Sequence, residues 1–274
     1  MNVSAIVAIV VSLVLNLFAW RLGLDYMWSV LLVFGGMALT FLVNAVKVFS
    51  RDNWKLFGGF VVFSNVCTLG VEIVMLKYDV WGFSDRVQRL SGLMFLGYPV
   101  EEFVYWAMCP GIVAGAYMVL GKKMDKFLDP VSLSRIAALG SALTRPLKND
   151  TAVKYTPDAG TGKYQEGERR PVYVWLQVAI VASIAFMSKY FKGNWKAVGW
   201  TTLVFFATAF PNELYALSQG FWLYNEKKLL GVFFFGVPLE GFMMYFIAPV
   251  CACMILDVSN RFLRQKIESR TTAE

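Results

Sequence analysis

The chain has 274 residues, of which 57% are hydrophobic and 16% charged, and its formal net charge is +7. A soluble domain usually contains about 45–50% apolar and about 25% charged residues, so this composition excludes a soluble multi-domain protein and indicates a membrane protein. The basic residues cluster in loops and in the C-terminal tail, which favours the lipid bilayer surface as a partner and not nucleic acid.

Seven apolar segments follow one another along the chain, each long enough to span a bilayer as a helix. The fourth and seventh each contain two prolines, so part of each is expected to be re-entrant, kinked or strongly tilted. We therefore predict an all-α polytopic membrane protein with about seven transmembrane helices. The segments run over residues 3–24, 27–48, 56–78, 90–120, 171–190, 197–218 and 229–257.

One long polar region, residues 121–170, separates the fourth segment from the fifth. Its many lysines and arginines indicate a cytoplasmic location. Within it, residues 130–143 have the pattern of a short amphipathic helix on the membrane surface. The remainder of this region is predicted to be a linker.

The sequence repeats itself around two prolines. With an offset of 139, six positions carry the same residue: Gly92/Gly231, Gly97/Gly236, Pro99/Pro238, Glu101/Glu240, Phe103/Phe242 and Pro110/Pro249. Upstream, with an offset of 141, Glu72 matches Glu213 and Trp81 matches Trp222. Internal self-similarity of this kind is typical of a duplicated structural unit.

The repeat predicts two three-helix units, the second inverted in the membrane relative to the first because each unit has an odd number of crossings. Inverted repeats commonly place a functional site at their pseudo-twofold axis near the bilayer midplane. The expected organisation is an extra N-terminal transmembrane helix (1–26), a first unit (27–120), the polar linker (121–170), a second unit (171–257) and a polar C-terminal tail (258–274).

Five acidic residues fall inside apolar segments: Glu72, Glu101, Glu102, Glu213 and Glu240. A carboxylate in hydrocarbon is costly and normally marks function. No lysine or arginine is close enough in sequence to pair with them, so they are expected to contact one another, backbone groups or Asn212. Burial favours the neutral carboxylic acid, which is the proton donor needed for general-acid chemistry on an apolar substrate. The structural alternative is a set of neutral glutamates that hydrogen-bond between helices.

The first glutamate of the pair at 101–102 recurs in the repeat as Glu240, whereas the second is replaced by Gly241. Adjacent helical residues point about 100° apart, so Glu101 and Glu102 are expected to face different ways. Aromatic residues crowd the same segments and their ends. They are typical of a core or an interface belt, but beside acids in an apolar pocket their ring faces can also stabilise a cation. The set comprises Trp81, Phe103, Tyr105, Trp106, Trp222, Phe242 and Tyr245.

The chain contains no histidine. Ser-His-Asp and Cys-His nucleophile sites, histidine-ligated zinc sites and haem with a histidine ligand are therefore excluded. No G-x-G-x-x-G dinucleotide fingerprint follows a predicted strand. We accordingly expect neither a metal nor another cofactor.

These motifs resemble those of the integral-membrane lycopene cyclase domain family, heterodimers of related three-helix subunits or their fusions. That family carries a proline-x-Glu-Glu/Asp-aromatic motif in each half, here Pro99–Phe103 and Pro238–Phe242. The resemblance covers roughly residues 27–120 and 171–257 as a fused arrangement. The chain departs from the family pattern at Gly241, where a second acid is common.

The resemblance implies a carotenoid cyclase of the lycopene β-cyclase type, an intramolecular lyase or isomerase. Such an enzyme protonates the terminal alkene of a linear polyene, closes the ring through a tertiary cation and removes a ring proton without net redox change. We expect Glu101, Glu102 and Glu240 to handle protons. Glu72, Asn212, Glu213 and the aromatic set are expected to bind lycopene or a related polyene. A multi-pass plasma-membrane location and association with other carotenoid enzymes are further expectations.

Two other functions fit parts of the pattern. A proton- or cation-coupled secondary transporter also uses inverted repeats and intramembrane carboxylates, and it is the main alternative. A non-catalytic subunit of an assembly is another. A retinal-binding photoreceptor is disfavoured, because no lysine lies between Lys228 and Lys266 to form a Schiff base in the last helix.

Overall fold

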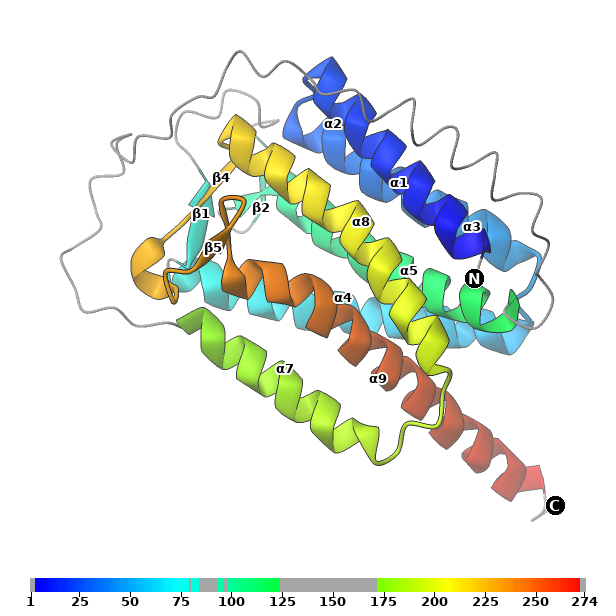
Figure 1. Cartoon of the computed structure of the whole chain (residues 1–274). Coiled ribbons are helices and arrows are strands. Elements are labelled where there is room, and N and C mark those ends of the chain that lie inside the picture. The colour runs from blue at the N-terminus through cyan, green and yellow to red at the C-terminus, as the bar shows by residue number, and fades with distance from the viewer. Residues whose placement is uncertain (1–2, 79, 84–92, 96–97, 124–171, 272–274) are drawn as a thin grey trace.

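The structure of the protein is a computed structural model that describes residues 3–78, 80–83, 93–95, 98–123 and 172–271. The described chain is mostly helical, and three short two-stranded sheets gather at one end of the helical bundle (Figure 1). Most of the predicted linker, with the amphipathic helix expected at 130–143, lies outside the described residues.

The first half of the chain forms four long helical stretches. The second of these is continuous, but it contains one π-helical turn, a local widening of the helix that often accompanies functional sites. The elements are α1 (Val3–Leu22), α2 (Tyr26–Val30), the π-helix η1 (Leu31–Gly35), α3 (Gly36–Val46), α4 (Arg51–Lys77), β1 (Trp81–Phe83), β2 (Met94–Phe95), β3 (Tyr98–Pro99) and α5 (Val100–Lys123).

The second half has the same order of elements after its first helix, namely a long helix, a strand, a hairpin and a long helix. Its last helix continues through most of the sequence that was expected to be a polar tail. The elements are α7 (Val172–Ser188), α8 (Trp195–Gln219), β4 (Trp222–Tyr224), the 3-10 helix η2 (Glu226–Lys228), β5 (Phe233–Phe234), β6 (Val237–Pro238) and α9 (Leu239–Thr271).

The described part of the chain has five helices that are long and apolar enough to cross a membrane, where the sequence predicted about seven. The two remaining segments are α7, which is apolar but short, and α8, which is long but carries buried threonine, asparagine and glutamate side chains. Helix α8 lies in the middle of the bundle, packed on α1, α5 and α9 (Figure 1). This position allows it to carry buried polar side chains, and these lower its mean hydropathy.

Large apolar side chains cover the outside of the bundle. Trp175, Val66 and Phe186 are more than 60% exposed, at 71%, 67% and 62% respectively. A soluble monomer rarely shows such a continuous apolar surface. The exposed rings and aliphatic chains are therefore a lipid-facing surface, and the chain is a membrane protein.

The fourth and seventh apolar segments do not begin as helices. In the second half, β5 and β6 form a hairpin whose two turn residues, Phe235 and Gly236, have φ values of 52° and 84°. This is the left-handed region that glycine adopts without strain and that two-residue hairpin turns require. Proline ends each hairpin because it has no amide hydrogen for further pairing, and the helix begins at the next residue. The second proline of each segment lies inside α5 or α9.

The two hairpins match residue for residue at the offset of 139 found in the sequence. Met94 pairs with Pro99 as Phe233 pairs with Pro238. The amide of Val100 donates to Leu93 O at 3.0 Å, and that of Leu239 donates to Val232 O at 2.7 Å. The helix start is thus tied to the hairpin in the same way in both halves.

The extra helix α1 is attached to α8 by buried polar groups. The Ser12 hydroxyl donates to Thr208 Oγ1 at 2.8 Å, and the Asn16 amide donates to Thr208 O at 3.2 Å. In a membrane, apolar side chains find similar surroundings in lipid, so such interhelical hydrogen bonds add specificity that burial cannot. Helix α1 is therefore an integral part of the bundle.

This contact predicts a measurable coupling between Ser12 and Thr208. In a double-mutant cycle, Ser12→Ala and Thr208→Val should each lower the free energy of unfolding in detergent, with a coupling energy of about 0.6 kcal/mol. Ser183→Ala is a matched control, since that hydroxyl is exposed and bonds only within its own helix. Strictly additive effects of the two substitutions would show that the bond contributes nothing.

Candidate active site

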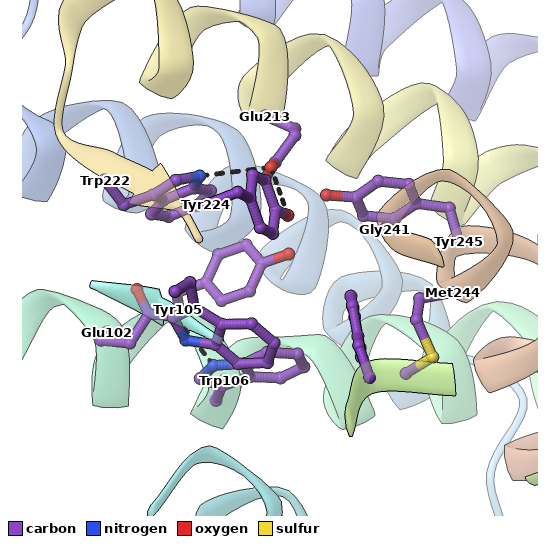
Figure 2. A pocket seen from close by; sticks show the side chains of 11 residues that line it. Glu102, Tyr105, Trp106, Glu213, Trp222, Tyr224, Gly241, Met244 and Tyr245 are labelled. Carbon is purple, nitrogen blue, oxygen red and sulfur yellow. Dashed lines mark hydrogen bonds between the residues drawn. The ribbon is translucent and has the colours of Figure 1, made fainter. Parts of the chain in front are cut away.

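One cavity lies between α5, α8 and α9, below the β1–β4 strand pair. Its volume is about 50 Å³, well below the range of about 300–1,000 Å³ typical of ligand pockets, so its walls lie close together. Figure 2 shows Glu213, Trp222 and Tyr224 on one side of it and Glu102, Tyr105 and Trp106 on the other. The described lining is Trp81, Glu102, Tyr105, Trp106, Tyr173, Glu213, Trp222, Tyr224, Gly241, Met244 and Tyr245.

Helices α5 and α9 present equivalent faces to this cavity. Each contributes positions i, i+3 and i+4 of its first turns, which lie on one side of an α-helix. From α5 these are Glu102, Tyr105 and Trp106, and at the offset of 139 α9 contributes Gly241, Met244 and Tyr245. Three pairs of equivalent residues thus line a single cavity.

Glu102 is one of the two acids in the cavity and is 4% exposed. Its two carboxyl oxygens each accept one hydrogen bond: Oε2 from the Tyr26 hydroxyl at 3.0 Å, and Oε1 from Trp106 Nε1 at 2.9 Å. Uncharged donors thus hold both oxygens of this carboxyl group in apolar surroundings.

Glu213 is the second acid, and it is held differently. Trp222 Nε1 and the Tyr224 hydroxyl donate to its Oε1 at 3.2 and 2.8 Å, and the Tyr245 side chain is a further hydrogen-bond partner of the carboxyl group. Burial, reinforced by the nearby Glu213 carboxyl, raises the pKa of Tyr224 well above its usual value, so the hydroxyl stays protonated and remains a donor. Three side-chain donors from aromatic residues thus hold the Glu213 carboxyl group.

The two halves contact each other reciprocally around the cavity. Strands β1 and β4 pair antiparallel, with Trp81 opposite Tyr224 and Phe83 opposite Trp222. Trp81 packs edge-to-face on Tyr173 of α7 at a ring distance of 5.3 Å, and Trp222 packs in the same way on Tyr26 of α2 at 5.2 Å. Each half therefore places its strand tryptophan against a tyrosine at the start of the other half's first helix.

Glu72 occupies the position in the first half that Glu213 occupies in the second. It is 1% exposed, and its Oε1 accepts from Trp81 Nε1 at 2.9 Å. Among the described residues, its Oε2 has no hydrogen-bond partner. Unlike Glu213, Glu72 does not line the cavity, but two of its hydrogen-bond partners, Trp81 and Trp106, do.

Glu101 and Glu240 are fully buried but do not line the cavity. The Leu230 amide donates to Glu240 Oε1 at 2.5 Å, and Gln177 Nε2 donates to the Glu240 carbonyl oxygen. Glu240 thus connects the start of α9 to the loop before the hairpin and to α7. As expected from helix geometry, Glu101 and Glu102 face different ways, and only Glu102 reaches the cavity.

The remaining predicted site residues divide between the cavity and the packing around it. Trp81, Tyr105, Trp106, Trp222 and Tyr245 line the cavity, whereas Phe103, Phe242 and Asn212 do not. Phe103 packs on Phe95 and Phe242 on Phe234, which are equivalent contacts between helix and hairpin at 5.1 and 5.4 Å. The side-chain amide of Asn212 is buried without a hydrogen-bond partner among the described residues.

Five residues of the site were not predicted as site residues: Tyr26, Tyr173, Tyr224, Gly241 and Met244. The sequence repeat could have identified Gly241 and Met244, because at the offset of 139 they are the equivalents of Glu102 and Tyr105. Tyr26 and Tyr173 lie at helix starts without a motif, so only the folded structure brings them to the acids. Among the described residues, no group of three or more acidic or cysteine side chains is placed to hold a metal ion.

A comparison with protein families matches two segments of the chain, residues 25–120 and 171–258, to the lycopene cyclase family. Both Pro-x-Glu motifs and every described residue that lines the cavity fall within these segments. No curated protein and no solved structure matches the chain. Since the matched segments make up more than half of the chain, the protein belongs to the lycopene cyclase family.

Proposed function

We propose that this protein closes β-rings on the ends of lycopene or a related linear polyene, by proton transfer in the cavity between α5, α8 and α9. The observation that carries the proposal is a pair of buried carboxyl groups, Glu102 and Glu213, in an otherwise aromatic and apolar cavity. The described ion pairs involve neither of them. Their protons are thus available for exchange with a bound substrate.

The different hydrogen bonding of the two acids supports different roles. Glu213, whose Oε1 accepts from Trp222 and Tyr224, gives its proton to the terminal alkene of the polyene. The resulting tertiary cation is attacked by the neighbouring double bond, which forms the ring and moves the positive charge onto a ring carbon. Glu102, whose two oxygens are both hydrogen-bonded, then accepts the proton from the adjacent ring carbon.

One proton enters and one leaves, so the reaction is an isomerisation without net oxidation or reduction. The cation must survive until the second proton transfer, and the cavity walls support this. Tyr105, Trp106, Trp222 and Tyr245 present aromatic rings around it, and aromatic ring faces attract positive charge. Closely packed rings also exclude the water that would otherwise capture the cation.

We further propose that the two halves are inverted repeats and that the cavity lies on their pseudo-twofold axis. The reciprocal tryptophan–tyrosine contacts, the self-complementary β1–β4 pairing and the matching hairpins all support this relation. In this arrangement α7 and α8 also cross the membrane, which makes seven crossings of a multi-pass plasma-membrane protein. Association with other carotenoid enzymes would supply so apolar a substrate without passage through water.

The cyclase function predicts a change in pigment. Cells that accumulate lycopene should form ringed carotenoids of unchanged mass when they express this chain, because cyclisation rearranges bonds without adding atoms. Chromatography with mass spectrometry measures the products. Unchanged lycopene in cells whose membranes contain the protein would contradict the proposal and would favour a transporter instead.

The assignment of the two acids predicts the effect of glutamine substitutions. Glu102→Gln and Glu213→Gln should each lower ring formation by at least about 10²-fold, because glutamine keeps the shape of glutamate but has no transferable proton. The rate should be measured on purified protein in liposomes loaded with lycopene. Glu226→Gln, at an exposed glutamate in η2, is the matched control.

The variant Glu240→Gln distinguishes Glu213 as the proton donor from the prediction made from the sequence, in which Glu240 handles protons. The glutamine amide oxygen can still accept the Leu230 N–H, so this variant should lose far less activity than Glu213→Gln. A loss of about 10²-fold in Glu240→Gln, together with near wild-type activity in Glu213→Gln, would show that the proton donor is the glutamate of the Pro-x-Glu motif and not Glu213.

A further inference from the structure

The two halves differ at two positions that face the same acid. Where the first half has Glu102 the second has Gly241, and where the first half has Phe83 the second has Tyr224, at offsets of 139 and 141. The second half thus lacks an acidic side chain on its helix and has an additional hydroxyl on its strand. That hydroxyl donates to Glu213 at 2.8 Å.

The two differences are sterically connected. A Cβ atom on Gly241 would lie 3.1 Å from the Tyr224 hydroxyl oxygen, 3.3 Å from Val237 Cγ1 and 3.5 Å from Pro238 Cγ. The first two distances are shorter than ordinary van der Waals contact. Val237 and Pro238 are buried, and the backbone of Tyr224 is held opposite Trp81 in the strand pair. Any side chain at position 241 therefore pushes on the hydroxyl.

We propose that Gly241 and Tyr224 act together as positioning residues that make Glu213, rather than its equivalent Glu72, the working acid of the cavity. The missing side chain at position 241 leaves room for the Tyr224 hydroxyl on Glu213 Oε1, and this hydrogen bond holds the Glu213 carboxyl group in its position at the cavity wall. Glu72 has a phenylalanine at the corresponding strand position and does not line the cavity. This inference rests on the proposed cyclase function.

A double-mutant cycle tests the connection. Tyr224→Phe should lower kcat for ring formation roughly tenfold, the factor that corresponds to the loss of one ordinary hydrogen bond, with KM unchanged. Gly241→Ala should lower kcat by a similar factor through displacement of the same hydroxyl. The double variant should be no slower than the slower single variant, because once the hydroxyl is absent the added methyl group has no hydrogen bond to Glu213 to disturb.

Gly111→Ala is the matched control, since Gly111 also lies inside a helix but a Cβ there meets no atom within 4 Å. Alanine is favoured over glycine in helices, so helix propensity alone does not lower activity in either variant. Protein amount in membranes and the unfolding midpoint in detergent should be measured for all variants. A kcat effect of Gly111→Ala equal to that of Gly241→Ala would overturn the proposal.

Three further results would also overturn it: multiplicative losses of kcat in the double variant, an effect of Gly241→Ala on KM alone, or wild-type kcat in Tyr224→Phe. The first would show that the residues act independently, and the second that position 241 only makes room for the polyene. These results are distinguishable from failure of the cyclase proposal. In that case the wild-type protein forms no ringed product, or Glu213→Gln remains fully active.

Discussion

Carboxyl groups buried in an apolar bundle need hydrogen-bond donors, and much of the structure follows from that requirement. No lysine or arginine reaches the buried glutamates among the described ion pairs. Their described donors are instead indole N–H groups, tyrosine hydroxyls and a backbone amide. Unlike a cation, such donors leave the carboxyl group able to be either neutral or charged. That freedom is what a group must have if it is to give or accept a proton.

The requirement also explains the small sheets at the end of a helical membrane protein. Strands β1 and β4 carry Trp81 and Trp222 toward glutamates on α4 and α8, the helices that precede them. The pairing of the two strands holds these tryptophans in place. The hairpins before α5 and α9 bring the first turns of these helices to the cavity, and the loop before the second hairpin donates a backbone amide to the buried Glu240.

If two similar halves share one cavity, each half supplies an equivalent set of side chains. A proton donor and a proton acceptor, however, need different surroundings. The differences lie at few positions here. Glu102 and its equivalent Gly241 both line the cavity, and Glu213 has a described tyrosine donor that Glu72 does not have. The tryptophan–tyrosine contacts between the halves, in contrast, are reciprocal. The proposed division of roles thus needs only local changes within a common scaffold.

The sequence by itself determined the membrane class, the helical character, the family and the burial of five glutamates, because composition and self-similarity are properties of the chain alone. It also contained the equivalence of α5 and α9 at an offset of 139.

Which glutamates reach the cavity was decided only by the tertiary structure. Glu101 and Glu102 are neighbours in one motif, yet the helix turns only Glu102 inward. Glu213 and Glu72 match in sequence, yet the packing of α8 at the centre brings only Glu213 to the cavity wall. Tyr26 and Tyr173 carry no motif, because their role comes from contact with residues far away in the chain.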